Sequence, residues 1–211
     1  MNKAENVLDY YYKACKLKEV ERSGWGDWNI SRTGPVERIA EHIYGTQILA
    51  MAIYLEYELD LNIDKVTTMH AHHETEEIEI GDITPFDGVT DVKKHELGKI
   101  AVSNIVSKIK NGEYIKRYID EFEKRETKEG MFAYLIDKLE CILWAKKYSD
   151  TGRISLETAP KEKIENVKEY IEKGANDAGD IFREFHKYKF EKDEVFMEII
   201  NTLEKYIIKE K

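Results

Sequence analysis

The scarcity of proline limits the fold of this chain more than any other feature. Only three prolines occur in 211 residues, and the long segments between them are rich in Glu, Lys, Ile, Leu and Tyr. These residue types sustain long helices, whereas proline interrupts them. Apolar residues also recur at three- and four-residue spacing, most clearly at Phe132, Leu135, Ile136, Leu139 and Leu143. The sequence therefore predicts an all-α fold.

The expected helices follow from this spacing and from capping and turn residues. They cover about 3–18, 35–58, 65–75, 91–110, 130–148, 160–173 and 177–209. A shorter helix is expected between the break at Asn111-Gly112 and about residue 124. Pro35 fits a first helical turn, and Asp64 is the expected N-cap of the third helix. The segment 78–88, which contains Gly81-Asp82 and Pro85, is expected to be a loop. In the first helix, Leu8, Tyr11, Tyr12 and Cys15 form an apolar side.

Length and composition favour one globular domain. A chain of 211 residues with 42% hydrophobic and 36% charged residues can bury a full core. We expect a single domain over 1–211, with the chemically active part at about 16–148 and helices at 157–209 completing the bundle. Tyr-rich stretches such as DYYYK and IYLEYEL could present an apolar side to a partner or, equally, be buried in the core.

Charge and cysteine content exclude several classes of protein. The net charge of −9 speaks against binding to duplex nucleic acid, which usually requires excess positive charge. No apolar run approaches the roughly 18 residues needed to span a membrane, and the N-terminus is too polar for a signal peptide. Cys15 and Cys141 match no zinc spacing and are expected to be free thiols, which suits a cytoplasmic protein.

The stretch HHETEEIEIGD, from His72 to Asp82, is the most informative for chemistry. Together with His42 upstream and Asp137 downstream, it combines imidazoles and carboxylates on separate helical segments. Such a mixture suits a borderline or hard divalent metal. Taken alone, a histidine or aspartate on a helix is usually an ordinary core or surface residue. The combined order, AEH, then His-acid-x-x-Glu-x-x-x-x-Asp, then a helical Asp, is more specific.

These residues resemble those of the HD-domain metal phosphohydrolases, and within them the small 5′-deoxynucleotidase-like branch. The resemblance covers about 16–148 and rests on LKEVERSGW, VERIAEHIYGTQILA, HHETEEIEIGDITPFD and LIDKLECILWAKKY. It implies a homodimer of single HD-domain helical bundles, each holding one divalent metal, which could be Mn, Co, Fe, Mg or Zn. It also implies that the metal ligands are His42, His73, Glu74 and Asp137.

The same resemblance implies roles for four further residues. Glu77 resembles the acid that positions the attacking water, and Asp82 the residue that reads the sugar 3′-hydroxyl. Arg22 looks like the phosphate-facing cation and Trp25 like its neighbouring aromatic. Alternatively, Arg22 is an ordinary surface arginine and Trp25 anchors its loop on the core. Lys138 and Glu140 are read as helix-face residues.

Three positions depart from the family pattern. Glu74 stands where the signature has Asp, and its extra methylene extends the carboxylate by about 1.5 Å. Arg38 replaces a small Ser, and either supplies another cation near the phosphate or points to solvent. His70 lies one helical turn before His73, where it is a supporting neighbour of the metal site or an ordinary core or surface histidine.

The expected function is therefore cleavage of deoxyribonucleoside 5′-monophosphates to a nucleoside and phosphate. Two alternatives stay open at this point. One is an HD phosphohydrolase or phosphodiesterase acting on another phosphorylated metabolite. The other is a protein that binds a nucleotide or metal without hydrolysing it, for which the Glu74 change is the motive.

Overall fold

The chain forms an all-α structure, as the sequence predicts. The computed structural model describes residues 2–26, 28, 30, 34–85, 87–206 and 208. Among these residues the only bridge between extended segments pairs Glu21 with Arg38. No described helix is long and apolar enough to cross a membrane. The elements are α1 (Lys3–Ala14), the 3₁₀ helix η1 (Cys15–Lys18), α2 (Ser23–Gly26), α3 (Ile39–Glu56), α4 (Ile63–His72), α5 (Glu77–Ile80), α6 (Asp91–Val106), α7 (Glu113–Lys124), α8 (Lys128–Asp150), α9 (Lys161–Asn166), α10 (Lys168–Glu172), α11 (Ala178–Lys187) and α12 (Glu194–Leu203).

The helices belong to two compact units. The first unit comprises Met1–Ser23 and Glu37–Tyr134, and the second comprises Gly24–Val36 and Leu135–Lys211. Helix α8 is continuous through the boundary, with its first turns in the first unit and the rest in the second. The expectation of one domain over 1–211, with its active part at about 16–148, stays a prediction.

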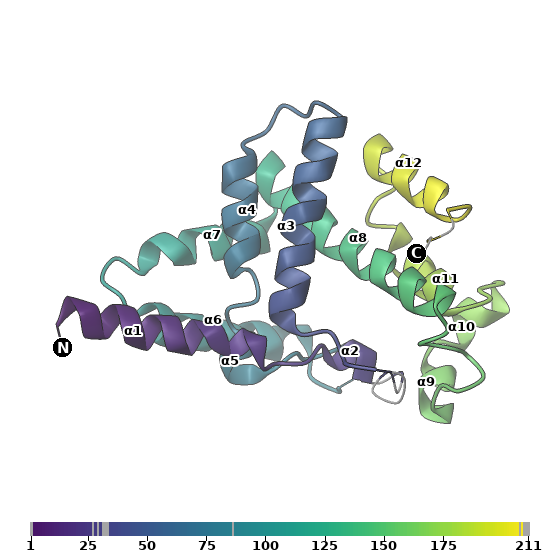
Figure 1. Cartoon of the computed structure of the whole chain (residues 1–211), viewed down its shortest axis with the longest axis horizontal. Helices are drawn as coiled ribbons and strands as arrows, with labels where there is room; N and C mark the ends of the chain where they lie inside the picture. The colour runs from purple at the N-terminus through teal and green to yellow at the C-terminus, as the bar shows by residue number, and fades with distance from the viewer. Residues whose placement is uncertain are drawn as a thin grey trace. The chain divides into compact units, whose positions relative to one another are not determined.

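The first unit is a set of helices packed in succession. Helices α3 and α4 lie side by side, and α4 packs in turn against α7 (Figure 1). Helix α6 contacts α7, α5 and α1, while η1 packs on α3 and α5. The buried faces of α3 and α4 carry Ile39, Ala50, Ile53, Val66 and Met69. This packing brings the ends of α3, α4 and α5 near one another, where the polar residues of interest lie.

Two boundaries near these polar residues differ from the sequence expectation. The N-cap of α4 is Asn62, whose side chain accepts a hydrogen bond from the Lys65 N–H, and not Asp64. The segment expected to be a loop begins with the short helix α5. Gly81 ends that helix with φ of 73°, a left-handed conformation that glycine adopts without steric cost. The helix therefore depends on a turn that periodicity alone does not reveal.

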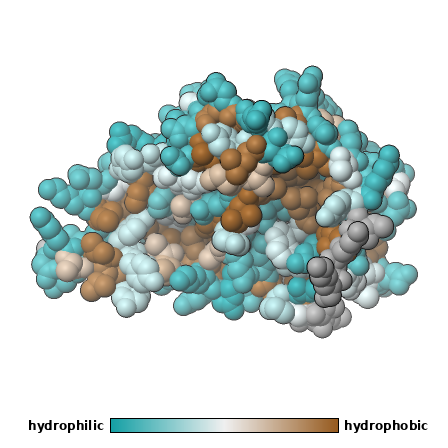
Figure 2. Space-filling view, turned by 45° about the horizontal axis from the view of Figure 1, so that its top comes forward, coloured by the Kyte–Doolittle hydropathy of each residue, from teal (hydrophilic) through white to brown (hydrophobic). Residues whose placement is uncertain are grey.

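The apolar side of α1 is not part of the core. None of its residues is buried, and Leu8, Tyr11 and Tyr12 are each more than half exposed. Figure 2 shows one face of the molecule, on which exposed hydrophobic residues (brown) lie between hydrophilic ones (teal). The 3.6-residue period thus identifies the helix correctly but does not say what covers its apolar side.

The second unit has its own core, built around Trp25 and Trp28. These rings pack with residues of α8 and α11, including Ala145, Tyr148 and Ile181. Helix α11 approaches α8 so closely that a Cβ at Gly179 would lie 2.9 Å from the Cα of Lys146. The Gly179 N–H donates a hydrogen bond of 3.0 Å to Ser149 Oγ at the same point. A glycine is therefore required at this contact.

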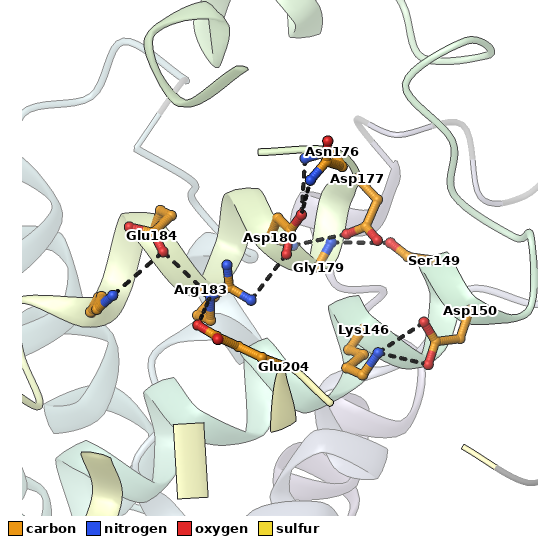
Figure 3. A network of polar contacts seen from close by, with 11 residues as sticks. Lys146, Ser149, Asp150, Asn176, Asp177, Gly179, Asp180, Arg183, Glu184 and Glu204 are labelled. Atoms are coloured by element: carbon orange, nitrogen blue, oxygen red, sulfur yellow. Dashed lines mark hydrogen bonds and ion pairs between the residues drawn. The ribbon is translucent and has the colours of Figure 1, made fainter. Parts of the chain in front are cut away.

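A polar network surrounds the start of α11 (Figure 3). Arg183 forms ion pairs with Asp180, Glu184 and Glu204, and Lys146 pairs with Asp150. The network borders a cavity of about 430 Å³. Since its cations already bind carboxylates of the same unit, the network is a structural feature of this unit.

The C-terminal region contains more helices than expected. The segment expected as one helix over 177–209 is divided, because α11 ends at Lys187 and Asp193 caps a new helix with hydrogen bonds from Val195 N–H and Phe196 N–H. The segment 160–173 is likewise divided between α9 and α10. The expected end at Lys209 lies outside the described residues, as do 27, 29 and 31–33 of the loop before α3 and Phe86 of the 78–88 segment.

Candidate metal centre

His42 lies in the first turns of α3, on the face that packs inward. Ile39, Thr46 and Ala50 share this buried face at helical spacing, and His42 itself is 0% exposed. A fully buried imidazole requires polar partners, because burial without them is costly. We therefore expect His42 to serve a polar function at this buried position rather than to fill space in the core.

His73 is held in one orientation by the backbone of the preceding helix. It is the C-cap of α4, and its ring Nδ1 lies 2.9 Å from the carbonyl oxygen of His70. A carbonyl can only accept, so this contact requires a proton on Nδ1 and leaves the lone pair on Nε2. A hydrogen bond of this kind selects the tautomer of metal-binding histidines. His70 supports His73 through its main chain, and its own ring is fully buried beside it.

Glu74 reaches both imidazoles despite its extra methylene. Its Oε1 lies 3.4 Å from His73 Nε2 and 3.7 Å from His42 Nε2. The expectation that His73 and Glu74 are neighbours within one helix is wrong, because α4 ends at His72 and Glu74 lies in the following turn. This turn frees Glu74 from the 100° offset of adjacent helical residues.

Asp137 lies on α8 and is 4% exposed. Each of His42, His73, Glu74 and Asp137 offers one atom to a group in which all the atoms lie within 4.8 Å of one another. Lys138 Nζ lies 2.6 Å from Asp137 Oδ2. Lys138 thus has a specific ionic partner, which its interpretation as a helix-face residue did not anticipate, and Glu140 is buried rather than exposed.

The donor set and its spacing fit a divalent metal ion. Two ligand atoms bound to one ion at about 2.1 Å are separated by roughly 3 to 4.2 Å. The separations of 3.4 Å and 3.7 Å fall in this range. Two imidazoles with two carboxylates suit borderline and hard divalent ions alike, so the cluster indicates a divalent metal without specifying its identity.

Two further acids lie beside this cluster. Burial and the nearby Glu74 carboxylate raise the pKa of Glu76 to about 7. Burial raises the pKa of Glu77 well above its ordinary value, and Glu74 and Asp82 add to the effect. Among the described residues, Glu76 Oε2 and Glu77 Oε2 are buried without a hydrogen-bond partner. Such a concentration of buried acid is costly unless protons or a cation neutralise it.

Asp82 links the turn after α5 to the segment that carries Arg22. Its Oδ2 accepts a hydrogen bond of 2.8 Å from the Ser23 N–H. The other carboxylate oxygen accepts no hydrogen bond from a described residue. Asp82 is half-buried.

Arg22 is positioned by Glu37. The Arg22 Nε lies 3.6 Å from Glu37 Oε2, and the Arg22 N–H donates to the Glu37 carbonyl oxygen at 2.9 Å. Glu37 is 4% exposed, and the Arg22 side chain is 15% exposed. Arg38, by contrast, is an exposed residue whose Nη1 donates to the Lys18 carbonyl. Arg38 is thus exposed, but its guanidinium is hydrogen-bonded to the backbone rather than extended into solvent.

Trp25 lies in the core of the second unit. It is 1% exposed, stacks on Phe182 and meets Tyr148 edge-on, in each case with 5.1 Å between ring centroids. These contacts favour the alternative in which Trp25 anchors its loop. His72, for which the sequence suggests no task, is partly buried, and burial followed by the charge of His73 lowers its pKa.

The sequence did not single out four features of this region: the His70 carbonyl, Glu37, Glu76 and Lys94. Lys94 Nζ donates a 2.8 Å hydrogen bond to the Ile83 carbonyl oxygen. Glu37 and Lys94 act through contacts with distant segments, for which a linear motif carries no signal. The His70 carbonyl lies three residues before His73, so only the spacing of the two histidines could have pointed to it.

The fold and the metal-suited cluster together define a class, that of all-α proteins with a mixed imidazole–carboxylate site. The model of the HD domain matches residues 14–200, and the chain belongs to the HD-domain family. It is 30% identical over 151 residues to the 5′-deoxynucleotidase HDDC2 of Dictyostelium discoideum, covering 68% of this chain and 77% of that protein. It is 30% identical over 156 residues to the 5′-deoxynucleotidase hdd1 of Schizosaccharomyces pombe, covering 70% and 76%.

The fold is also found in solved structures. The PH0347 protein from Pyrococcus horikoshii OT3 superposes with a TM-score of 0.67 at 19% identity, covering 94% of this chain and 98% of that one. At this level of identity the likeness concerns the fold alone. It extends the agreement beyond the roughly 70% of the chain that the sequence relatives cover.

Proposed function

We propose that this protein is a metal-dependent 5′-deoxynucleotidase, which hydrolyses deoxyribonucleoside 5′-monophosphates to a nucleoside and inorganic phosphate. The observation that carries the proposal is the approach of Glu74 Oε1 to both imidazoles, at 3.4 Å and 3.7 Å. It supports a ligand role for Glu74 despite its departure from the family signature. The activity named for the two sequence relatives supports the same substrate class.

In this proposal His42, His73, Glu74 and Asp137 hold the ion, which is Mn, Co, Fe, Mg or Zn. When bound, such an ion would acidify a water molecule and offset phosphate charge. Its charge would also favour the ionised form of the Glu77 carboxyl group. Glu77 then orients the attacking water and accepts its proton, which is general-base catalysis.

The substrate is held at two ends. Arg22, oriented by Glu37, binds the phosphate with charge-assisted hydrogen bonds. The second oxygen of Asp82 accepts a hydrogen bond from the 3′-hydroxyl of the sugar, since the first already accepts one from the Ser23 N–H. Trp25 contributes indirectly, because its packing anchors the loop that follows Arg22.

The remaining parts of the proposal concern the setting of the enzyme. Cys15 and Cys141 are free thiols, which supports a reducing, cytoplasmic environment. The net charge of −9 supports a small nucleotide rather than a nucleic-acid duplex as partner. A homodimer is supported by the exposed apolar residues of α3, where Tyr44, Ile48 and Leu55 are 68%, 54% and 64% exposed and share one side of the helix.

Release of inorganic phosphate from a panel of nucleotides tests the function. The purified protein is assayed with deoxyribo- and ribonucleoside 5′-monophosphates, with nucleoside cyclic monophosphates and with unrelated phosphate esters, each with Mn, Co and Mg. We expect turnover of the deoxyribonucleoside monophosphates. Faster hydrolysis of a phosphodiester or of another phosphorylated metabolite would show that the natural substrate belongs to that class instead. Nucleotide binding without hydrolysis would identify a non-catalytic protein.

A further inference from the structure

Lys94 makes an unusual contact for a lysine next to a cluster of acids. It lies in the first turn of α6, is half-buried, and donates a hydrogen bond of 2.8 Å from Nζ to the Ile83 carbonyl oxygen. Among the described residues, no carboxylate lies within 4.0 Å of this ammonium group. The adjacent Lys93 shows the usual arrangement, with a side chain that is 60% exposed and 3.8 Å from Glu96. Lys94 is thus directed at one backbone carbonyl.

That carbonyl belongs to the residue after Asp82. The contacts that hold the 81–84 segment include one from Lys94 Nζ to the Ile83 carbonyl oxygen and one from the Ser23 N–H to Asp82 Oδ2. The segment enters with Gly81 at φ of 73°, a residue that imposes little conformational restraint of its own. The position of the free Asp82 oxygen therefore depends on the Lys94 contact from one side and on Ser23 from the other.

The contact is stronger than an ordinary turn hydrogen bond. An ammonium donor makes a charge-assisted bond, which is about twice as strong as a neutral one. Helix α6 continues through Val106 and packs against α5 and α7, so the donor stands on a rigid element. The charge of Lys94 also lowers the pKa of Glu77, opposing the effect of burial. Lys94 therefore lies close enough to influence Glu77 as well as the segment that carries Asp82.

We propose that Lys94 is a positioning residue for the sugar end of the substrate, which holds the Ile83 carbonyl so that the free oxygen of Asp82 meets the 3′-hydroxyl. This inference rests on the proposed function, and within it Lys94 acts through Asp82 rather than on the substrate. The preference for a 3′-hydroxyl then depends on a cation that lies on helix α6, eleven residues after Ile83. A displacement of about 1 Å at such a contact costs up to about a hundredfold in rate.

The test compares a deoxyribonucleoside 5′-monophosphate with its 2′,3′-dideoxy counterpart. We expect Lys94→Met to lower the ratio of kcat/KM on the first substrate to kcat/KM on the second by about tenfold or more, because any effect of the lost charge through Glu77 falls on both substrates alike. Asp82→Asn should do the same, and the double variant should lose no more than either single variant, because the two residues act as one unit. Lys94→Arg should restore part of the preference. The matched control is Lys93→Met, which should behave as the wild type.

A measurement without substrate examines the contact itself. Amide hydrogen exchange at Ser23 and at 81–84 should accelerate in Lys94→Met and not in Lys93→Met, with the thermal midpoint confirming that both variants are folded. Equal losses on both substrates, or unchanged exchange, would overturn the inference. Wild-type protein that hydrolyses no nucleotide would overturn the proposed function, and the exchange result would still decide whether Lys94 holds the turn.

Discussion

The Nδ1 of His73, the C-cap of α4, lies 2.9 Å from the carbonyl oxygen of His70 in the last turn of that helix. The contact commits the proton to Nδ1 and directs the lone pair of Nε2 toward Glu74, 3.4 Å away. The last turn of α4 thus prepares a metal ligand with its own backbone. The supporting group is a carbonyl, so any residue at position 70 that keeps the helix supplies it.

His73→Ala should remove bound metal and phosphohydrolase activity together, because Nε2 is one of four converging donor atoms. Metal content is measured by mass spectrometry on protein purified alongside the wild type. His72→Ala is the control, since His72 is a neighbour outside the cluster. Activity retained in His73→Ala would show that the ligand assignment is wrong.

Glu74→Asp should weaken metal binding even though it restores the family signature. Glu74 lies in a turn after α4 and already reaches both imidazoles, so a carboxylate shortened by about 1.5 Å would withdraw from them. We expect an affinity loss of at least about tenfold by metal titration, in line with perturbed metal sites. Tighter binding in Glu74→Asp would mean that Glu74 is a poor substitute for the signature residue.

Arg22→Ala should raise KM by roughly tenfold to a hundredfold, the value of one or two hydrogen bonds to a charged group. The effect should be greater on KM than on kcat if Arg22 binds the phosphate equally in the ground and transition states. Arg38→Ala is the control, because this exposed arginine donates to the Lys18 carbonyl instead. Steady-state kinetics that change equally in both variants would contradict a specific role for Arg22.

Glu76→Gln should stabilise the metal-free protein at alkaline pH. Burial raises the pKa of Glu76 from 4.5 to about 7. Below about pH 4.5 the group is protonated in both the folded and unfolded chain, and as the pH rises through about 7 the folded chain loses the stability that the bound proton provides. Glutamine mimics the protonated acid at every pH. Its advantage should therefore be small near pH 4 and large near pH 8, by thermal unfolding with chelator present.

The control for that experiment is Glu126→Gln, which alters an exposed glutamate. Its thermal midpoint should follow the wild type across the same range. An offset between Glu76→Gln and wild type that does not vary with pH would show that the two differ in packing rather than in proton binding.

Ile48→Glu with Leu55→Glu should dissociate a homodimer formed through α3, because two charges would enter an apolar contact. Light scattering coupled to size-exclusion chromatography gives the mass directly. Tyr188→Glu, an exposed position in the second unit, serves as control. A wild-type protein that elutes as a monomer at all concentrations would exclude the dimer.

Local chemistry determined much of this protein. The proline-poor, periodic sequence is sufficient for the all-α class, because helix formation depends on residues within a few positions of one another. The spacing of His42, His73, Glu74 and Asp137 identified a set of potential ligands, and the structure brings those four together. Glu77 and Asp82 were identified as candidates through the resemblance to the HD-domain family, and their roles stay predictions.

Tertiary packing decided the rest. Helix α4 ends at His72 rather than Thr75, so Glu74 lies in a turn from which it reaches both imidazoles. The contact between Lys94 and Ile83 joins segments that are separate in the sequence. The apolar side of α1 is exposed rather than buried in the core. A helical period records which side of a helix is apolar. Which residues that side packs against depends on contacts that only the folded chain creates. The same contacts decide which acidic side chains are buried next to one another.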